Sequence, residues 1–148
     1  MSVQQRARQW LAYQPVEQDG AGFSQLIEDY HSRYQLPIMV TETSAKGDES
    51  IRARWLEASV AAIRVLRGRG IPVLGYTWFP LFTMIDWKYR FGRGPLDEYR
   101  LDLGLYTLDG TERWRATPLV EQFRSYVTDS EAAIGNIGVK EPSSSPSS

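Results

Sequence analysis

The sequence predicts an α/β fold built around one parallel strand–helix–strand unit. Three observations predict it: an apolar run at residues 37–41, a second at residues 72–77, and a long segment of helical periodicity between them, about Glu49 to Arg67. Each run begins at a proline and has the length and composition of a strand buried on both faces. Since a strand, a helix and a strand at this spacing form a βαβ unit, the two strands should be parallel and their crossover right-handed.

Length and composition limit the classes of protein. The 148 residues suffice for one domain with a hydrophobic core, and 42% hydrophobic with 24% charged residues is typical of globular proteins. A net charge of -1 gives no electrostatic reason to expect a nucleic acid or an anionic membrane as partner. The absence of cysteine excludes disulfides and thiolate sites, and the single histidine, His31, excludes a multi-histidine metal site. We therefore expect no metal and no cofactor.

The N-terminal segment, residues 1–21, is polar and carries turn signals at Pro15 and Gly20, so we expect it to be poorly ordered. It lacks the apolar core of a secretory signal, and no apolar run in the chain approaches the length of a membrane span. These features favour a soluble protein of the cytoplasm.

Two helices frame the first strand. The segment from Phe23 to Tyr34 carries its apolar residues on one stripe, and His31 lies beside that stripe as a surface or packing residue. The longer helix should begin after Asp48, a favourable N-cap, and end at the glycines that follow Arg67.

The second half contains fewer regular patterns. Residues 79–94 form a long aromatic loop, and residues 103–106 form a short extended piece before a turn at Asp109–Gly110. A last helix should follow, with Thr117 as N-cap and proline at its first position. From about residue 128 the composition shifts toward a Pro/Ser-rich tail, which predicts disorder over residues 128–148.

Glu42 follows the first apolar run directly. An ionised carboxylate is costly to bury, so it contributes little to stability at the end of a buried strand. The carboxyl ends of parallel strands are where α/β barrels and open α/β sheets hold their ligands and catalytic groups. We interpret Glu42 as a candidate catalytic residue, and the alternative is a glutamate that is solvated or paired with an arginine.

Three segments in register resemble the C-terminal part of family 1 glycoside hydrolases, the β-glucosidase type of retaining enzyme. Residues 37–42, Pro-Ile-Met-Val-Thr-Glu, resemble the strand-seven motif, in which Thr-Glu-Asn-Gly follows apolar residues. Residues 75–87, from Gly-Tyr to Asp-Trp, resemble the strand-eight motif that ends in Glu-Trp, and residues 104–109 resemble a Gly-Leu-Val-Tyr-Val-Asp segment. The agreement covers residues 22–127. It implies a C-terminal fragment of a (β/α)8 TIM barrel, with strands seven and eight and their helices, incomplete as a barrel.

The resemblance also implies roles for four residues. Glu42 would be the nucleophile, and Asp86 would take the place of a sugar-binding glutamate beside Trp87. Phe79 would replace the tryptophan that forms the floor of the sugar subsite. The sequence departs from the family pattern in two places. Thr-Ser follows Glu42 where the family has Asn-Gly, and residues 91–99 resemble an insertion. Both departures bear on which sugar the site would accept.

The family's acid/base glutamate lies on strand four in an Asn-Glu-Pro motif, which this sequence does not contain. A complete barrel takes about 250 residues. The resemblance therefore implies a β-glycoside as substrate and a chain that is inactive alone. Two other hypotheses stay open. One is a subunit that completes a barrel with a separately encoded N-terminal segment, and the other is a non-catalytic carbohydrate-binding module that stacks sugars on Trp78, Trp87 and Tyr89.

Overall fold

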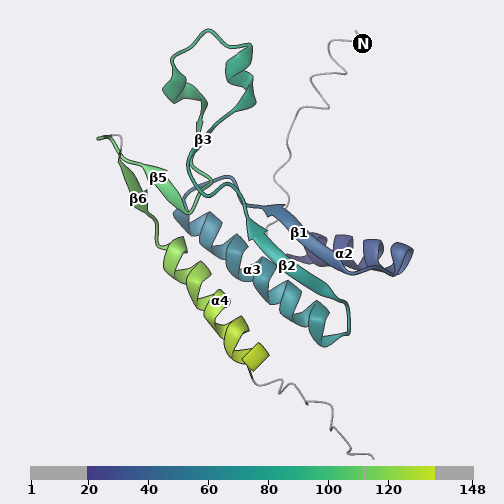
Figure 1. The fold of residues 1–148 in the computed structure, drawn as a ribbon. Helices are drawn as coiled ribbons and strands as arrows, with labels where there is room; N and C mark the ends of the chain where they lie inside the picture. Colours follow the sequence, from purple (N-terminus) through teal and green to yellow (C-terminus); the bar gives the residue numbers. More distant parts are fainter. Residues whose placement is uncertain (1–19, 112, 136–148) are drawn as a thin grey trace, which may run out of the picture.

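The computed structural model describes residues 20–111 and 113–135 (Figure 1). Two predictions therefore lie wholly or partly outside the described residues. They are the poorly ordered N-terminal segment at residues 1–21, of which residues 1–19 are outside, and the tail, of which residues 136–148 are outside.

The first half of the described chain is the expected βαβ unit with a helix before it. The order is helix α2 (Ala21–Tyr34), strand β1 (Ile38–Thr43), helix α3 (Glu49–Gly68) and strand β2 (Val73–Trp78). The two strands pair in parallel, with Ile38 opposite Val73 and Thr43 opposite Trp78, so the predicted pairing is confirmed. Strand β1 continues two residues beyond the predicted end at residue 41, and Glu42 therefore lies within it.

The second half consists of short elements followed by a helix. Strand β3 (Met84–Ile85) pairs antiparallel with β4 (Arg100–Leu101), and the 3-10 helices η1 (Trp87–Arg90) and η2 (Leu96–Tyr99) lie between them. Strands β5 (Tyr106–Leu108) and β6 (Trp114–Ala116) form an antiparallel hairpin before helix α4 (Leu119–Gly135). The prediction of an irregular loop over residues 79–94 is thus wrong at β3 and η1, because β3 gains its order from a partner strand outside that range.

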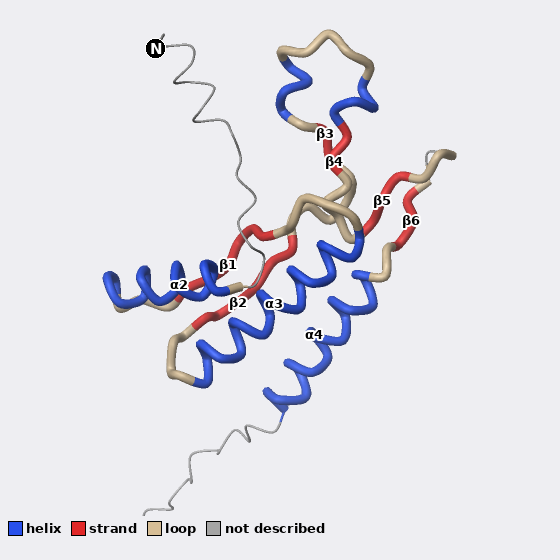
Figure 2. The backbone as a smooth tube through the Cα atoms, turned by 180° about the vertical axis from the view of Figure 1, so that it is seen from behind, coloured by secondary structure: helices blue, strands red, loops and turns tan. Residues whose placement is uncertain are grey.

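The helices cover one face of the β1–β2 pair. Helices α3 and α4 run side by side along it, and α2 lies on the other side of α3 (Figures 1 and 2). Val40 and Val73 are buried toward the helices, whereas Met39 and Leu74 are 58% and 69% exposed. The sheet is not closed into a barrel by the described residues.

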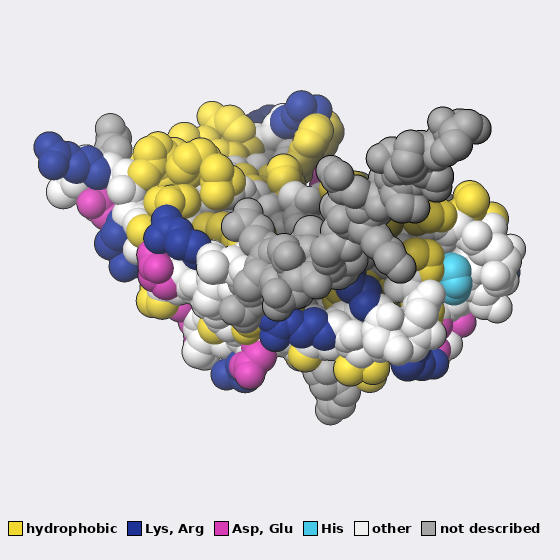
Figure 3. Space-filling view, turned by 60° about the horizontal axis from the view of Figure 1, so that its bottom comes forward, with side chains coloured by type: hydrophobic (Ala, Val, Ile, Leu, Met, Phe, Trp, Pro, Cys, Tyr) yellow, Lys and Arg dark blue, Asp and Glu magenta, His cyan; other side chains and the backbone are white. Residues whose placement is uncertain are grey.

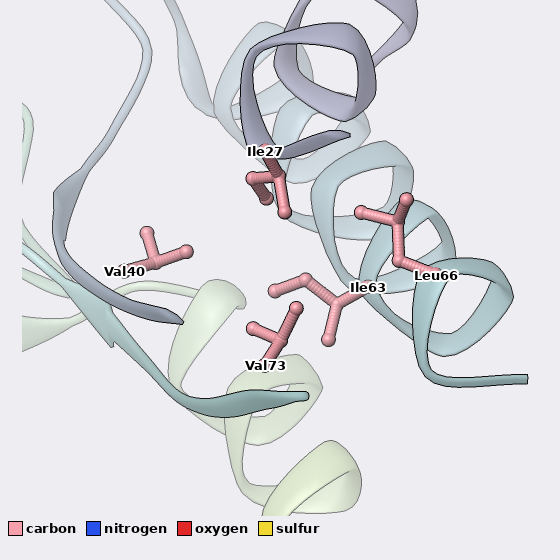
Figure 4. Packing of buried hydrophobic residues seen from close by; sticks show 5 residues of the cluster. All are labelled: Ile27, Val40, Ile63, Leu66 and Val73. Carbon is pink, nitrogen blue, oxygen red and sulfur yellow. The ribbon is translucent and has the colours of Figure 1, made fainter. Parts of the chain in front are cut away.

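Two hydrophobic clusters hold these layers together. In the first, side chains of α2, α3 and both strands of the pair converge: Ile27, Val40, Ile63, Leu66 and Val73 (Figure 4). The second joins α3, β2, the segment before β5 and α4 through Leu56, Trp78, Leu105 and Leu119. Tyr76 packs against both clusters and so connects them.

The helix ends follow the sequence signals in part. Asp48 Oδ1 accepts a hydrogen bond from the backbone N–H of Ile51 at 2.9 Å, which confirms the predicted N-cap of α3. The hydroxyl of Thr117 instead donates to the carbonyl oxygen of Leu105 at 2.8 Å, and so ties the start of α4 to the segment before β5. Helix α4 runs to Gly135, past residue 128 where sequence places the start of the tail.

Candidate functional site

Glu42 and Phe79 come to the same end of the parallel pair. Glu42 is the last residue but one of β1, and its side chain is exposed. The backbone N–H of Phe79 donates to the carbonyl oxygen of Thr43 at 3.1 Å, so the hydrogen-bonded ladder extends one residue beyond β2. A carboxylate and a half-exposed aromatic ring therefore belong to the carboxyl ends of two paired strands.

The backbone at Glu42 is fastened through its neighbour Thr43. The indole N–H of Trp55, on α3, donates to Thr43 Oγ1 at 2.8 Å. Trp55 is itself packed edge-on against Phe23 of α2, with ring centroids 5.7 Å apart. The strand end is thus held by two helices while the carboxylate of Glu42 stays accessible.

The surroundings of the Glu42 carboxylate are open. No residue of the described part of the chain donates a hydrogen bond to it or forms an ion pair with it, so it is solvated rather than paired with an arginine. It lines a hollow of about 260 Å³ between α2 and β1, and among the described residues that line this hollow it is the one carboxylic acid. Hydrolysis of a glycoside with retention requires two carboxyl groups about 5–5.5 Å apart. The described residues of this hollow supply one.

Asp86 and Trp87 lie apart from Glu42. Asp86 Oδ1 accepts from the backbone N–H of Lys88 at 2.9 Å and caps η1. Trp87 is 65% exposed, and the guanidinium of Arg90 lies 4.3 Å from the centre of its ring, a cation–π arrangement. Within the described residues no contact joins either side chain to Glu42. Of the four residues that sequence selected, Glu42 and Phe79 belong to the carboxyl ends of paired strands, and Asp86 and Trp87 lie in the segment that follows β3.

Residues 86–99, here called the 86–99 excursion, form a small closed unit that projects from the strands (Figure 1). Its ends are joined by a hydrogen bond from Asp86 N–H to the carbonyl oxygen of Tyr99 at 2.7 Å. Inside it, the rings of Tyr89 and Tyr99 pack edge to face at 5.4 Å. A side chain at Gly92 would collide with the Tyr99 ring, which explains glycine at that close approach. The excursion contains the whole of the apparent insertion at residues 91–99.

The described part of the chain holds no group of three His, Asp or Glu side chains that could bind a metal ion. None of its helices is long and apolar enough to cross a membrane.

Comparison of structures decides the fold family, whereas no protein-family model and no curated protein sequence matches the chain. The GH1 β-glucosidase from Exiguobacterium antarcticum B7 superposes with a TM-score of 0.66 at 19% identity, over 82% of this chain and 29% of that one. The β-glycosidase from Thermosphaera aggregans gives 0.61 at 26% identity, over 72% and 21%. The β-glucosidase from Thermotoga maritima gives 0.61 at 17% identity, over 72% and 25%.

The chain has the fold of one part of a GH1 β-glucosidase. It spans less than a third of the length of each of these three enzymes. The resemblance drawn from the three sequence segments is confirmed at the level of the fold.

Within this GH1-like fold Trp78 is a core residue. It is 5% exposed, and its indole N–H donates to the carbonyl oxygen of Leu103 at 2.9 Å. The hypothesis of Trp78 as a stacking platform is therefore wrong. The reason is that its ring packs into the second cluster, with Leu56 of α3 and Leu119 of α4. Trp87 and Tyr89 of the same hypothesis are exposed.

Sequence reasoning missed a buried arginine that is hydrogen-bonded behind the loop that follows Phe79. Arg52 of α3 is 3% exposed and donates from Nη1 to the carbonyl oxygen of Gly104 at 2.8 Å. Gly104 in turn lies against the backbone of Leu81 and Phe82, in the loop that follows Phe79. The helical spacing of the sequence could have revealed Arg52. It falls on the same face of α3 as the other buried residues of that helix, Leu56, Ser59, Ile63 and Leu66.

Proposed function

We propose that this chain carries the nucleophile side of a retaining β-glycoside hydrolase site, on strands seven and eight of a (β/α)8 barrel. The observation that carries the proposal is the exposed Glu42 carboxylate at the carboxyl end of a parallel strand pair, whose other strand leads directly into Phe79. Catalytic groups of (β/α)8 enzymes occupy that end of the strands. The likeness to GH1 β-glucosidases, which concerns the fold, supports the choice of glycosides as substrates.

In the proposed reaction the Glu42 carboxylate attacks the anomeric carbon of the sugar and forms a glycosyl ester, while the bond to the leaving oxygen breaks. A second carboxylic acid protonates that oxygen, and then takes a proton from the water that hydrolyses the ester. The second acid comes from a polypeptide segment that adds the remaining strands, since the Asn-Glu-Pro motif is not in this sequence.

The other three residues bind the sugar in this proposal. The ring of Phe79 offers an apolar face to the sugar ring. Asp86 uses Oδ1 to cap η1, and its second oxygen is left to accept hydrogen bonds from sugar hydroxyls. Trp87 contributes an aromatic face beside it. To act on a sugar bound at Glu42, the 86–99 excursion has to lie over the same barrel mouth.

The first test uses the purified 148-residue chain alone with an activated aryl β-glycoside. We expect no hydrolysis above the uncatalysed rate, because a retaining mechanism needs its second carboxyl group. Turnover by the isolated chain that disappears in a Glu42→Gln variant would contradict this expectation and require an acid/base within the chain.

The second test uses an assembled enzyme, in which the missing barrel strands are supplied as a fused or co-expressed segment. Glu42→Gly should lower activity by at least about 10⁴-fold, the scale found when a catalytic nucleophile is removed. Added azide or formate should restore part of it by entering the vacated space. Glu57→Gln, a change at an exposed position of α3, is the control and should leave activity unchanged. Near-parental activity of Glu42→Gly would show that Glu42 is not the nucleophile.

A second candidate function is sugar binding without catalysis, favoured by the exposed rings of Trp87 and Tyr89. It requires the chain alone to bind oligosaccharides in calorimetry, with binding lost in Trp87→Ala and kept in Glu42→Gln. Binding lost in Glu42→Gln alone would favour the hydrolase site instead.

A further inference from the structure

The middle of the 86–99 excursion is rich in cations. Residues 88–96, which we call the excursion tip, contain Lys88, Arg90 and Arg93 and no acidic residue. All three cations are exposed, and in the described part of the chain none of them forms an ion pair with a carboxylate. The net charge of -1 for the whole chain therefore hides a local excess of positive charge.

The excursion tip also carries exposed apolar surface. Hydrophobic side chains reach the surface at several places, interspersed with charged ones (Figure 3). Phe91 is 91% exposed, the highest value among the large hydrophobic residues of the described chain, and Tyr89 and Leu96 are about half exposed. Exposed apolar side chains that gather on one projecting segment mark a surface for contact with a partner.

The acidic residues of the excursion stand close to its two ends. Asp86 caps η1, and Asp97 and Glu98 directly precede Tyr99, whose carbonyl oxygen closes the excursion. A ligand wrapped along the whole excursion would meet charges of both signs. A broad surface that meets only the tip encounters the cations, so the charges of the tip match an anionic surface.

The aromatic rings favour a lipid surface over a nucleic acid. Single-stranded nucleic acids stack their bases on free ring faces. Here Arg90 lies over the ring of Trp87, and Tyr89 packs edge to face against Tyr99. Phe91 has no ring contact within the described residues. A single apolar side chain between cations suits insertion among lipids, with the cations left at the headgroups.

We propose that the excursion tip docks onto a membrane surface that contains anionic lipids. The ring of Phe91 enters the boundary between headgroups and acyl chains, and the three cations lie at the lipid phosphates. This inference goes beyond the proposed function. It uses neither Glu42 nor a sugar, and Asp86 and Trp87 are not part of the tip.

The test uses the full chain in co-sedimentation with vesicles of phosphatidylserine and phosphatidylcholine in equal amounts. The chain should sediment with these vesicles and stay in solution with vesicles of phosphatidylcholine alone. Phe91→Ala should weaken the binding by about tenfold or more, because the buried ring is lost. Leu74→Ala, at another exposed apolar position, is the control and should leave binding unchanged. Equal binding to both kinds of vesicle, or equal effects of the two variants, would overturn the proposal.

A second pair of variants tests the cations. Arg93→Gln should weaken binding to the anionic vesicles by about fivefold, the effect of one cation near such a surface. Arg33→Gln removes an exposed cation on α2 and should have no effect. Added salt should weaken binding of the parent chain, because it screens exposed charges. Binding that ignores salt, or equal losses in the two variants, would count against the docking of this tip.

A fluorescent label shows which part of the chain meets the lipid. The sequence contains no cysteine, so a single introduced one can carry an environment-sensitive fluorophore. Its emission should shift to the blue with anionic vesicles in Phe91→Cys, and should not shift in Gly110→Cys, in the turn between β5 and β6. A shift at position 110 with none at position 91 would overturn the proposal.

Two further outcomes would replace the lipid by another partner. Binding of an oligothymidine strand without binding of vesicles would identify the tip as a nucleic-acid contact. Self-association in analytical ultracentrifugation that Phe91→Ala abolishes would show that a second copy of the chain covers it. Either result would overturn the proposal and leave the proposed function untouched, since no step of these tests involves catalysis.

Discussion

The side-chain oxygens of Ser59 and Tyr76 lie 2.8 Å apart and join helix α3 to strand β2. Ser59 donates to the carbonyl oxygen of Trp55 at 2.7 Å, so its hydroxyl is left to accept from Tyr76. Trp55 donates from its indole to Thr43. These bonds connect β2, α3 and the end of β1, and they make the position of Glu42 depend on the packing of the core.

The stability of the protein should fall in alkaline solution because of Tyr76. Burial raises the pKa of its phenol to about 12. The unfolded chain releases this proton near the ordinary pKa of about 10, whereas the folded chain holds it. Folding is therefore disfavoured increasingly as the pH rises from about 10 through about 12. Urea denaturation across this range measures the effect.

The variant Tyr76→Phe should lose most of this alkaline dependence, since no phenol is left at that position to titrate. Tyr34→Phe, at an exposed position of α2, is the control and should keep it. An unchanged pH dependence in Tyr76→Phe would show that another group is responsible.

Replacement of Arg52 by lysine should lower the free energy of unfolding more than replacement by methionine. Its guanidinium is buried, donates to the Gly104 carbonyl and leaves Nε without a partner among the described residues. Arg52→Lys keeps a buried charge on a shorter side chain and should lower the free energy of unfolding by about 3 kcal/mol. Arg52→Met removes the charge as well as the bond, and should cost about 1 kcal/mol. Urea denaturation of both variants checks the order, and a larger loss in Arg52→Met would contradict it.

The local patterns of the sequence predicted the βαβ unit, because each of its parts is defined by neighbours in the chain. Asp48 and the apolar runs act over a few residues, and the structure bears them out. The rotation of α3 was harder to predict. A stripe drawn through Ile51 and Trp55 describes the more apolar side of the helix, but the buried side passes through Arg52 and Ser59. Two polar residues are accepted there because partners distant in sequence satisfy them.

Sequence patterns predicted the positions of only some of the candidate site residues. Glu42 lies near the end of one strand and Phe79 directly after the other, and the parallel pairing of these strands could be expected. The positions of Asp86 and Trp87 depend on β4, which begins fourteen residues after Asp86 and contributes two residues to the pairing. No local pattern in the sequence predicts such a short pairing.

Gly104→Ala should disturb the loop behind Phe79. A methyl group at this position would lie 2.6 Å from the carbonyl carbon of Phe82 and 2.7 Å from the carbonyl oxygen of Leu81, so the backbone has to move. We expect a loss of about 1–3 kcal/mol in the free energy of unfolding, as for other overpacked sites. Gly110→Ala is the control, since open space surrounds that position and the change should stay within about 0.5 kcal/mol. Equal stability of the two variants in urea denaturation would show that the loop yields freely.

Asp48 should make the start of α3 sensitive to acid. The hydrogen bond from the Ile51 N–H lowers the pKa of this carboxyl below its usual value. Its contribution is therefore present at neutral pH and is lost as the pH falls through the folded-state pKa. Asp48→Ala should lower the melting temperature at neutral pH, and the gap to the parent should narrow in acid. Asp48→Asn should keep the cap without this pH dependence. Parallel thermal melts at neutral and acid pH separate the three proteins, and a gap that stays constant would rule out the carboxylate as the cause.

The hydrogen bond between Asp86 and Tyr99 brings the start and the end of the 86–99 excursion together. A segment whose ends meet can change in length or sequence while the strands on either side keep their places, because the closing bond is made by the backbone. During evolution such a segment accumulates insertions at little cost to the rest of the chain. For protein engineering it is a grafting position, where a loop of different composition could be joined to this scaffold with the β5–β6 hairpin and α4 left intact.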